Sequence, residues 1–306
     1  MTSPADGAED GSAAQQQLAE GLAGMRSRNM DAKLAAVHLL SELASASTSS
    51  PAGVGLPMAA KDRTALMKLA HDAAFRKRDE AARVLSSALL AGLISDDRAE
   101  NDAASALLRR HAYSLGFGGR STDSGEFMMM VPVLVQQLNC ADSTPLGKRE
   151  AAGSLMNLAW KSAKLAEAMT SHQALPALVK RLADDASDTA ELENAAGALL
   201  NILSHGDSAA AVQAAAAGLV STVTDRLLSV GKNKWSRFGA KLLGLAAAPA
   251  AARAQVAEDV IASSAVPHLC TLASPACKNS ETQCCALRTL GALGDCGSAA
   301  LSASIT

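Results

Sequence analysis

Six cysteines and six histidines are the side chains of this sequence that could bind a metal or act as nucleophile and base. The cysteines stand at positions 140, 270, 277, 284, 285 and 296, and no two have the C-x-x-C spacing that zinc sites favour. The histidines fall in separate segments, and none stands in a nucleophile or metal motif. We therefore predict no metal, no cofactor, no small-molecule substrate and no catalysis. We also predict reduced, buried or half-buried thiols in a cytoplasmic compartment.

A glycine-rich loop occupies residues 116–126, with the sequence GFGGRSTDSGE. A phosphate-binding loop needs a strand before it and a G-K-[ST] ending, or a helix N-terminus that faces the anion. Here a helical pattern precedes the loop and no lysine follows it. We therefore interpret the loop as a connection between structural units.

Positive charge gathers late in the sequence. The segment KNKWSRFGAK carries Lys234, Arg237 and Lys241 around Trp235, and Arg288 follows further on. Arginine and tryptophan are favoured anchors in protein interfaces, so this cluster suits an acidic segment of a protein partner. The alternative is an ordinary solvated helix face with Trp235 packed inside. The net charge of −2 and the lack of a long basic stripe argue against nucleic acid.

The elements that must position these side chains are amphipathic helices. Leu175, Leu178 and Leu182 recur at helical spacing within 174–183, and a second such segment covers 192–203. Hydrophobic residues make up 49% of the chain but aromatic residues only 2%. The core must therefore be built from Ala, Leu and Val, which suits closely packed helices, and the predicted fold class is all-α.

The same helices recur at a regular interval. One segment reads VPVLVQQL, LPALVKRL, VSTVTDRL and VPHLCTLA from residues 131, 175, 220 and 266, so it returns every 44 to 46 residues. Its partner reads AAGSLMNLA, AAGALLNIL, FGAKLLGLA and CALRTLGAL from residues 151, 195, 238 and 285. A short helical segment, such as 163–174, precedes the pair and gives three helices per unit. Because one such unit cannot bury its own apolar faces, copies must stack into a solenoid.

The chain divides around these units. Four of them cover residues 127–294, and residues 13–115 read as degenerate helical repeats with a flexible Ser-, Gly- and Pro-rich loop at 45–57. Residues 1–12 are small, polar and acidic, which predicts a disordered tail. Residues 295–306 read as the start of a further repeat or a tail. No uncharged run is long and apolar enough to predict a membrane span.

These units resemble armadillo repeats. The pattern of that family is a short helix, then A-[LV]-P-x-L-V-x-x-L, then x-x-A-A-x-x-L-x-N-L, and residues 163–204 match it best. The resemblance implies a right-handed α-solenoid of three-helix repeats, in which the third helices line a concave groove. It also implies protein partners, because the family is a large set of protein-binding scaffolds.

The resemblance also implies which residues line that groove. The recurrent groove Asn of the family matches Asn157 and Asn201, and glycine replaces it in the next two units. The same helix face one and two turns earlier, with one lysine beside it, adds Glu150, Ser154, Asn194, Lys234, Arg237, Lys241 and Arg288. An Asn amide can donate to and accept from an extended peptide, or it can bond within or between helices, and both uses stay open.

We predict a non-catalytic protein-interaction scaffold, a subunit of a larger assembly that could be cytoskeletal or ciliary. An acidic partner segment would bind in the C-terminal half of the groove. No charged capping helix follows the last unit, so we also expect end-on contact there. The alternative is a regulator that releases nucleotide from an Hsp70 chaperone. A nuclear transport adaptor is disfavoured, because Gly153 and Gly197 stand where importin-alpha has its groove Trp residues.

Overall fold

The computed structural model describes residues 89–117, 125–229 and 233–294, together with a few isolated residues before residue 89. The predicted tail 1–12, the loop 45–57 and the segment 295–306 lie outside the described residues, as do most of the degenerate repeats and the centre of the glycine-rich loop. The chain forms two compact units, Met1–Ser114 and Leu115–Thr306, and each is taken by itself below.

In the first unit, the described structure centres on α5 (Arg98–Phe117). The Asp97 carboxylate accepts a hydrogen bond from the backbone N–H of Ala99 at 2.9 Å, which satisfies one of the free N–H groups at the start of the helix. Ala104 and Leu108 are fully buried on the inner face of α5.

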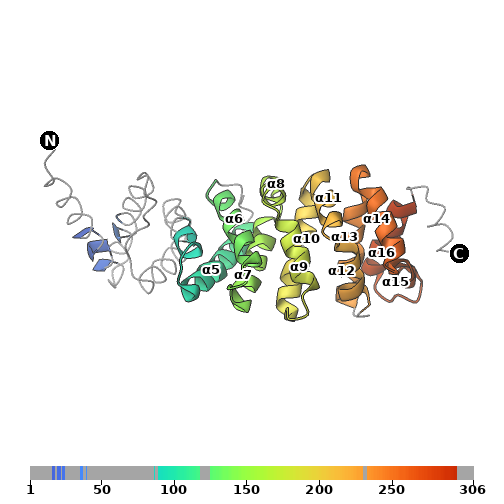
Figure 1. Ribbon diagram of the computed structural model, residues 1–306, viewed down its shortest axis with the longest axis horizontal. Helices are drawn as coiled ribbons and strands as arrows, with labels where there is room; N and C mark the ends of the chain where they lie inside the picture. The colour runs from blue at the N-terminus through green and yellow to red at the C-terminus, as the bar shows by residue number, and fades with distance from the viewer. Residues whose placement is uncertain are drawn as a thin grey trace. The chain divides into compact units, whose positions relative to one another are not determined.

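The second unit is a row of α-helices that follow one another along its length (Figure 1). A single helix α6 (Gly125–Asn139) and α7 (Pro145–Leu158) come first. Three-helix repeats follow: α8 (Ala163–Ser171), α9 (Ala174–Ala183) and α10 (Thr189–His205); α11 (Ser208–Ala216), α12 (Leu219–Val223) with a π-helical turn η1 (Thr224–Leu228), and α13 (Asn233–Ala247); α14 (Ala250–Ala262), α15 (Ala265–Ala273) and α16 (Ser280–Gly294). No strand occurs in the part of the chain that the structure describes, and the all-α prediction is confirmed.

One residue in the left-handed backbone region joins the first helix to the second in each of these three repeats. Gln173, Gly218 and Ser264 have φ values of 61°, 81° and 59° at equivalent places. The first unit of the array differs, because α6 runs through Pro132 without a break. The repeat that begins at Ala163 is therefore the first with three separate helices.

Small side chains bring neighbouring third helices close together. α7 packs against α10, α10 against α13, and α13 against α16. Gly197 lies so near α7 that a Cβ atom there would stand 2.4 Å from Met156 Sδ. Around this contact Leu155 and Leu199 are fully buried, as expected for a core of Leu and Ala.

A buried ion pair fixes the turn between α9 and α10. Arg181 Nε donates to Glu191 Oε1 at 2.6 Å, and the same guanidinium donates to Asp184 Oδ2 at 2.8 Å and to Ser187 Oγ at 3.1 Å. Burial alone would lower the pKa of Arg181, but the hydrogen bond and charge of Glu191 outweigh it and raise that pKa. Arg181 therefore stays charged and holds the turn in one conformation.

Candidate functional site

The predicted site residues lie on the four third helices, α7, α10, α13 and α16. Side-chain caps start three of these helices: Thr144 Oγ1 accepts from Gly147 N at 2.8 Å, Asp188 Oδ1 from Glu191 N at 2.7 Å, and Asn279 Oδ1 from Thr282 N at 2.8 Å. The caps set where each helix begins, and the mutual packing of the helices brings the predicted positions into register.

On α7, the predicted residues are in the packed interior. Ser154 is fully buried, Glu150 is 3% exposed and Asn157 is 9% exposed. Glu150 also lies 3.4 Å from the guanidinium of Arg149 beside it. These side chains present little surface to a partner in this conformation, and partner binding through them stays a prediction.

On α10, the two Asn amides reach backward to the helix of the preceding repeat. Asn201 Nδ2 donates to the Met156 carbonyl at 2.8 Å, and Asn194 Nδ2 donates to the Arg149 carbonyl at 3.0 Å. Met156 lies in the last turn of α7, where carbonyls have no partner within their own helix. Asn201 therefore serves a bond between helices, and its contact with a partner protein is a further prediction.

Thr289 makes the same kind of bond in the last repeat, and the sequence reasoning did not single it out. Its fully buried hydroxyl lies 2.5 Å from the Ala240 carbonyl of α13 and 2.8 Å from the Cys285 carbonyl of its own helix, and donation to Ala240 joins α16 to α13. The family pattern predicts an amide at the position of Gly291, whereas here a hydroxyl two residues earlier forms the bond between the helices. A polar residue on the otherwise apolar side of 285–293 was the signal available.

Two of the predicted cations pair with carboxylates of neighbouring repeats. Lys234 on α13 pairs with Glu193 on α10, and Arg237 lies 2.8 Å from Glu281 at the start of α16. Both pairs are substantially exposed to solvent, so each contributes little to stability by itself. The Arg237 guanidinium also lies 5.8 Å from the centre of the half-buried Phe238 ring.

Lys241 and Arg288 are exposed on α13 and α16, and neither pairs with a carboxylate of the residues that the structure describes. Burial raises the pKa of the Cys285 thiol, and the charge of Glu281 raises it further. The charges of Lys241, Arg288 and Arg237 act on that thiol in the opposite direction. These three cations come from the packed helices α13 and α16 and all act on the same thiol, and we call them the basic cluster.

Trp235 belongs to the core and not to the surface. It is 8% exposed, and its ring centre lies 6.2 Å from that of Phe238. The alternative in which Trp235 packs inside is therefore the observed one. The basic cluster therefore presents charge to solvent, whereas Trp235 packs in the core and offers little surface to a partner.

The described residues contain neither a candidate metal-ligand group nor a candidate membrane span. No group of His, Cys, Asp or Glu side chains capable of holding a metal ion occurs among the described residues. The five described cysteines are free thiols, and Cys140 and Cys284 are exposed, which corrects the expectation that the thiols are buried or half-buried. Among the described helices, none combines the length and apolarity that crossing a membrane requires.

Comparison with solved structures places this arrangement among armadillo solenoids. An engineered protein matches with a TM-score of 0.61 at 23% identity, over 85% of this chain and 96% of that chain. A second engineered protein matches with a TM-score of 0.58 at 23% identity, over 86% of this chain and 70% of that chain. A computationally designed armadillo repeat protein for modular peptide recognition matches with a TM-score of 0.55 at 20% identity, over 90% and 99%.

These matches confirm the predicted fold: a right-handed α-solenoid of armadillo-type repeats. At this level of identity they concern the fold alone, and they indicate no particular member of the family. No protein-family model matches the sequence, and no curated protein matches it either.

Proposed function

We propose that this chain is a non-catalytic protein-interaction scaffold that binds an acidic segment of a protein partner at the basic cluster. One observation carries the proposal: Lys241 and Arg288 are exposed on packed third helices of adjacent repeats and pair with no carboxylate of the described residues, beside Arg237, which pairs with Glu281. Lys241 and Arg288, the two cations of the cluster without such a pair, face solvent, where their charges attract carboxylates and steer their approach.

The geometry favours a partner that crosses from one repeat to the next. Lys241 and Arg288 lie on different helices, α13 and α16, that pack side by side. An extended chain has side chains on the same face every second residue, about 7 Å apart, so a few acidic residues can meet both cations. A folded acidic surface would have to match the same two positions rigidly.

The test is zero-length cross-linking, which joins a lysine amine directly to a carboxylate, on the full chain in its own extract. We expect Lys241 to link to Asp or Glu residues of one partner segment. The exposed Lys164 on α8 and Lys180 on α9 are the internal comparison and should give no such links. Links confined to the start of the array or to the end of α16 would contradict binding at the basic cluster.

A charge-reversed variant provides the second readout. The double variant Lys241→Glu/Arg288→Glu should bind the identified segment at least about tenfold more weakly, and added salt should weaken binding by the native chain. The control is Lys164→Glu/Lys180→Glu, which makes the same change in net charge on other helices. Equal loss of affinity in both variants would show that the net charge, and not this site, controls binding.

The last helix that the structure describes, α16, supports a second, end-on contact. Gly153, Gly197 and Ala240 are buried at equivalent positions of the other third helices, but Leu287 on α16 is 53% exposed. A Cβ atom added at Gly291 would meet nothing within 4 Å. The open Gly291 position is one that a following repeat would cover, as Thr289 covers the equivalent Gly244, so the exposed α16 surface suits contact with another chain of the same assembly.

A further inference from the structure

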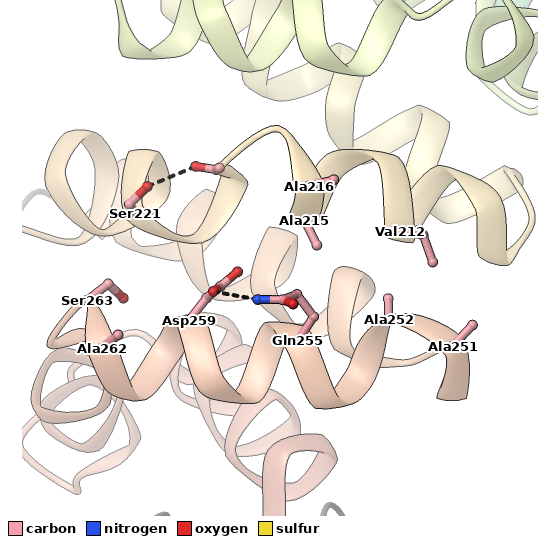
Figure 2. Close-up of a pocket in the computed structure, with 11 residues that line it drawn as sticks. Val212, Ala215, Ala216, Ser221, Ala251, Ala252, Gln255, Asp259, Ala262 and Ser263 are labelled. Atoms are coloured by element: carbon pink, nitrogen blue, oxygen red, sulfur yellow. Dashed lines mark hydrogen bonds between the residues drawn. The ribbon is translucent and has the colours of Figure 1, made fainter.

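A groove separates the first helices of two adjacent repeats, α11 and α14. Its volume is about 800 Å³, and we call it the α11–α14 groove. Figure 2 shows α11 on one side with Val212, Ala215 and Ala216, and α14 on the other with Ala252 and the polar side chains. Because five of the eleven lining residues are alanine, the helices supply methyl groups and little bulk of their own.

The equivalent contact one repeat earlier, between α8 and α11, shows why the α11–α14 groove is open. Between α8 and α11, Gln213 Nε2 donates to the Thr170 carbonyl at 3.1 Å and ties the two helices together. Gln213 lies five residues before Gly218, and Asp259 lies five residues before Ser264, so the two are equivalent. A carboxylate cannot donate a hydrogen bond to a backbone carbonyl, so Asp259 cannot make this tie.

Asp259 faces the groove instead. Figure 2 shows Asp259 and Gln255 rising from α14 into the space between the helices, with Gln255 Nε2 donating to Asp259 Oδ1 at 2.9 Å. No Lys or Arg stands among the residues that line the groove, all of which the structure describes, and none pairs with Asp259. The groove thus combines apolar walls with one carboxylate that lacks a cation.

From these features we propose that the α11–α14 groove binds an amphipathic helix of a partner protein, with aliphatic side chains on one face and a Lys or Arg opposite Asp259. The lining runs along α14 from Ala251 to Ser263. That stretch is about 18 Å long, which matches about three turns of a helix. Alanine walls leave room for the larger side chains of the guest helix, and the exposed Val212 adds an apolar contact at one end.

The experiment is a selection from displayed helical peptides of about 16 residues, which span about 24 Å, against the full chain. Each peptide has a fixed Leu and Ala face and randomised positions elsewhere. We expect the enriched peptides to share a Lys or Arg at one position relative to the leucines. Their binding should weaken at least about tenfold in Asp259→Lys, which replaces attraction by repulsion.

Matched variants separate the groove from its surroundings. Ala216→Trp fills the groove from an exposed position, so it should abolish binding without unfolding the chain, whereas Ala254→Trp adds the same bulk to α14 outside the groove. Glu258→Lys is the control for Asp259→Lys, because it makes the same charge change on the exposed neighbour. The proposal fails if no peptide prefers the native chain to Ala216→Trp, or if the selected peptides carry no cation. It also fails if Glu258→Lys weakens binding as much as Asp259→Lys.

Discussion

The amide of Asn201 shows how a single side chain joins two repeats. It satisfies the Met156 carbonyl, which lies in the last turn of α7 and has no partner within that helix. Alanine at this position would remove the bond and leave the carbonyl half-buried without a donor. A neutral hydrogen bond of this kind contributes about 1 kcal/mol to the free energy of unfolding.

We therefore expect Asn201→Ala to lower the free energy of unfolding by about 1 kcal/mol, or somewhat more if the carbonyl stays dry. Urea unfolding followed by circular dichroism measures the change. Asn139→Ala is the control, because Asn139 is exposed at the end of α6 and should change stability by less than about 0.5 kcal/mol. Equal effects of the two substitutions would show that the bond between helices contributes nothing.

For single residues, the sequence predicted which polar side chains matter better than it predicted what each of them bonds. Asn194 and Asn201 stand out because they interrupt an apolar helix, yet an amide that meets a partner and an amide that meets a neighbouring helix look the same in sequence. The distance between α7 and α10 decides between them, and the close contact of Gly197 with Met156 sets that distance. Such a contact between residues of different repeats cannot be read from one sequence.

At the scale of the helix, the Asp188 carboxylate that caps α10 makes the stability of the fold depend on pH. The backbone N–H of Glu191 donates to its carboxylate and the Arg149 guanidinium lies 3.4 Å away, so the pKa of Asp188 lies below its usual value. A carboxyl whose pKa is depressed by folding stabilises the native state above its unfolded pKa. That stabilisation is lost as the pH falls through the folded pKa.

The midpoint of thermal unfolding should therefore change little between about pH 7 and pH 5 from this group, and should fall below about pH 4. Asp188→Asn keeps a capping side chain but removes the titration, so the fall should be shallower in that variant. Calorimetry from pH 6 to pH 3 compares the two slopes. Parallel slopes would mean that other carboxyl groups account for the acid sensitivity.

The apolar periodicity predicted where helices occur. It did not predict whether a helix runs without a break. The first helix expected at 163–174 appears as α8, shorter at its C-terminal end, and α11 and α14 take the same place in the next two repeats. The unbroken α6 was missed, because Pro132 reads as a helix start although it lies inside the helix. The π-helical turn η1 was missed as well, because an extra backbone residue within a helix leaves the apolar spacing almost unchanged.

At the scale of the whole molecule, the recurrence every 44 to 46 residues was enough to predict the solenoid, because a repeated helix unit has few ways to bury its apolar face. The charge pairing between repeats was not predictable. Lys234 and Arg237 were expected to be open to a partner, but carboxylates that come 41 residues earlier and 44 residues later reach them. Lys241 and Arg288 keep the predicted exposure.

The exposed face of α16 leads to a prediction about association. We expect the native chain to self-associate at high concentration through Leu287, and Leu287→Glu to remain monomeric, because it places a charge in an apolar contact. Analytical ultracentrifugation over a range of concentrations measures this. The control is Leu146→Glu, since Leu146 on α7 is 45% exposed. A native chain that is monodisperse and monomeric at high concentration would contradict the end-on contact.

The joint between α10 and α13 has a mechanical consequence. Backbone-carbonyl bonds cross the joints on either side of it, through Asn201 and Thr289, but the described residues place none between α10 and α13. There the exposed pair of Lys234 with Glu193 spans the helices, and salt screens such a pair. Because Gln213 and Arg226 donate to the Thr170 and Asp184 carbonyls elsewhere between the same two repeats, this contact should act as the open side of a hinge. Under tension, α10 and α13 should part about those bonds, more readily as ionic strength rises.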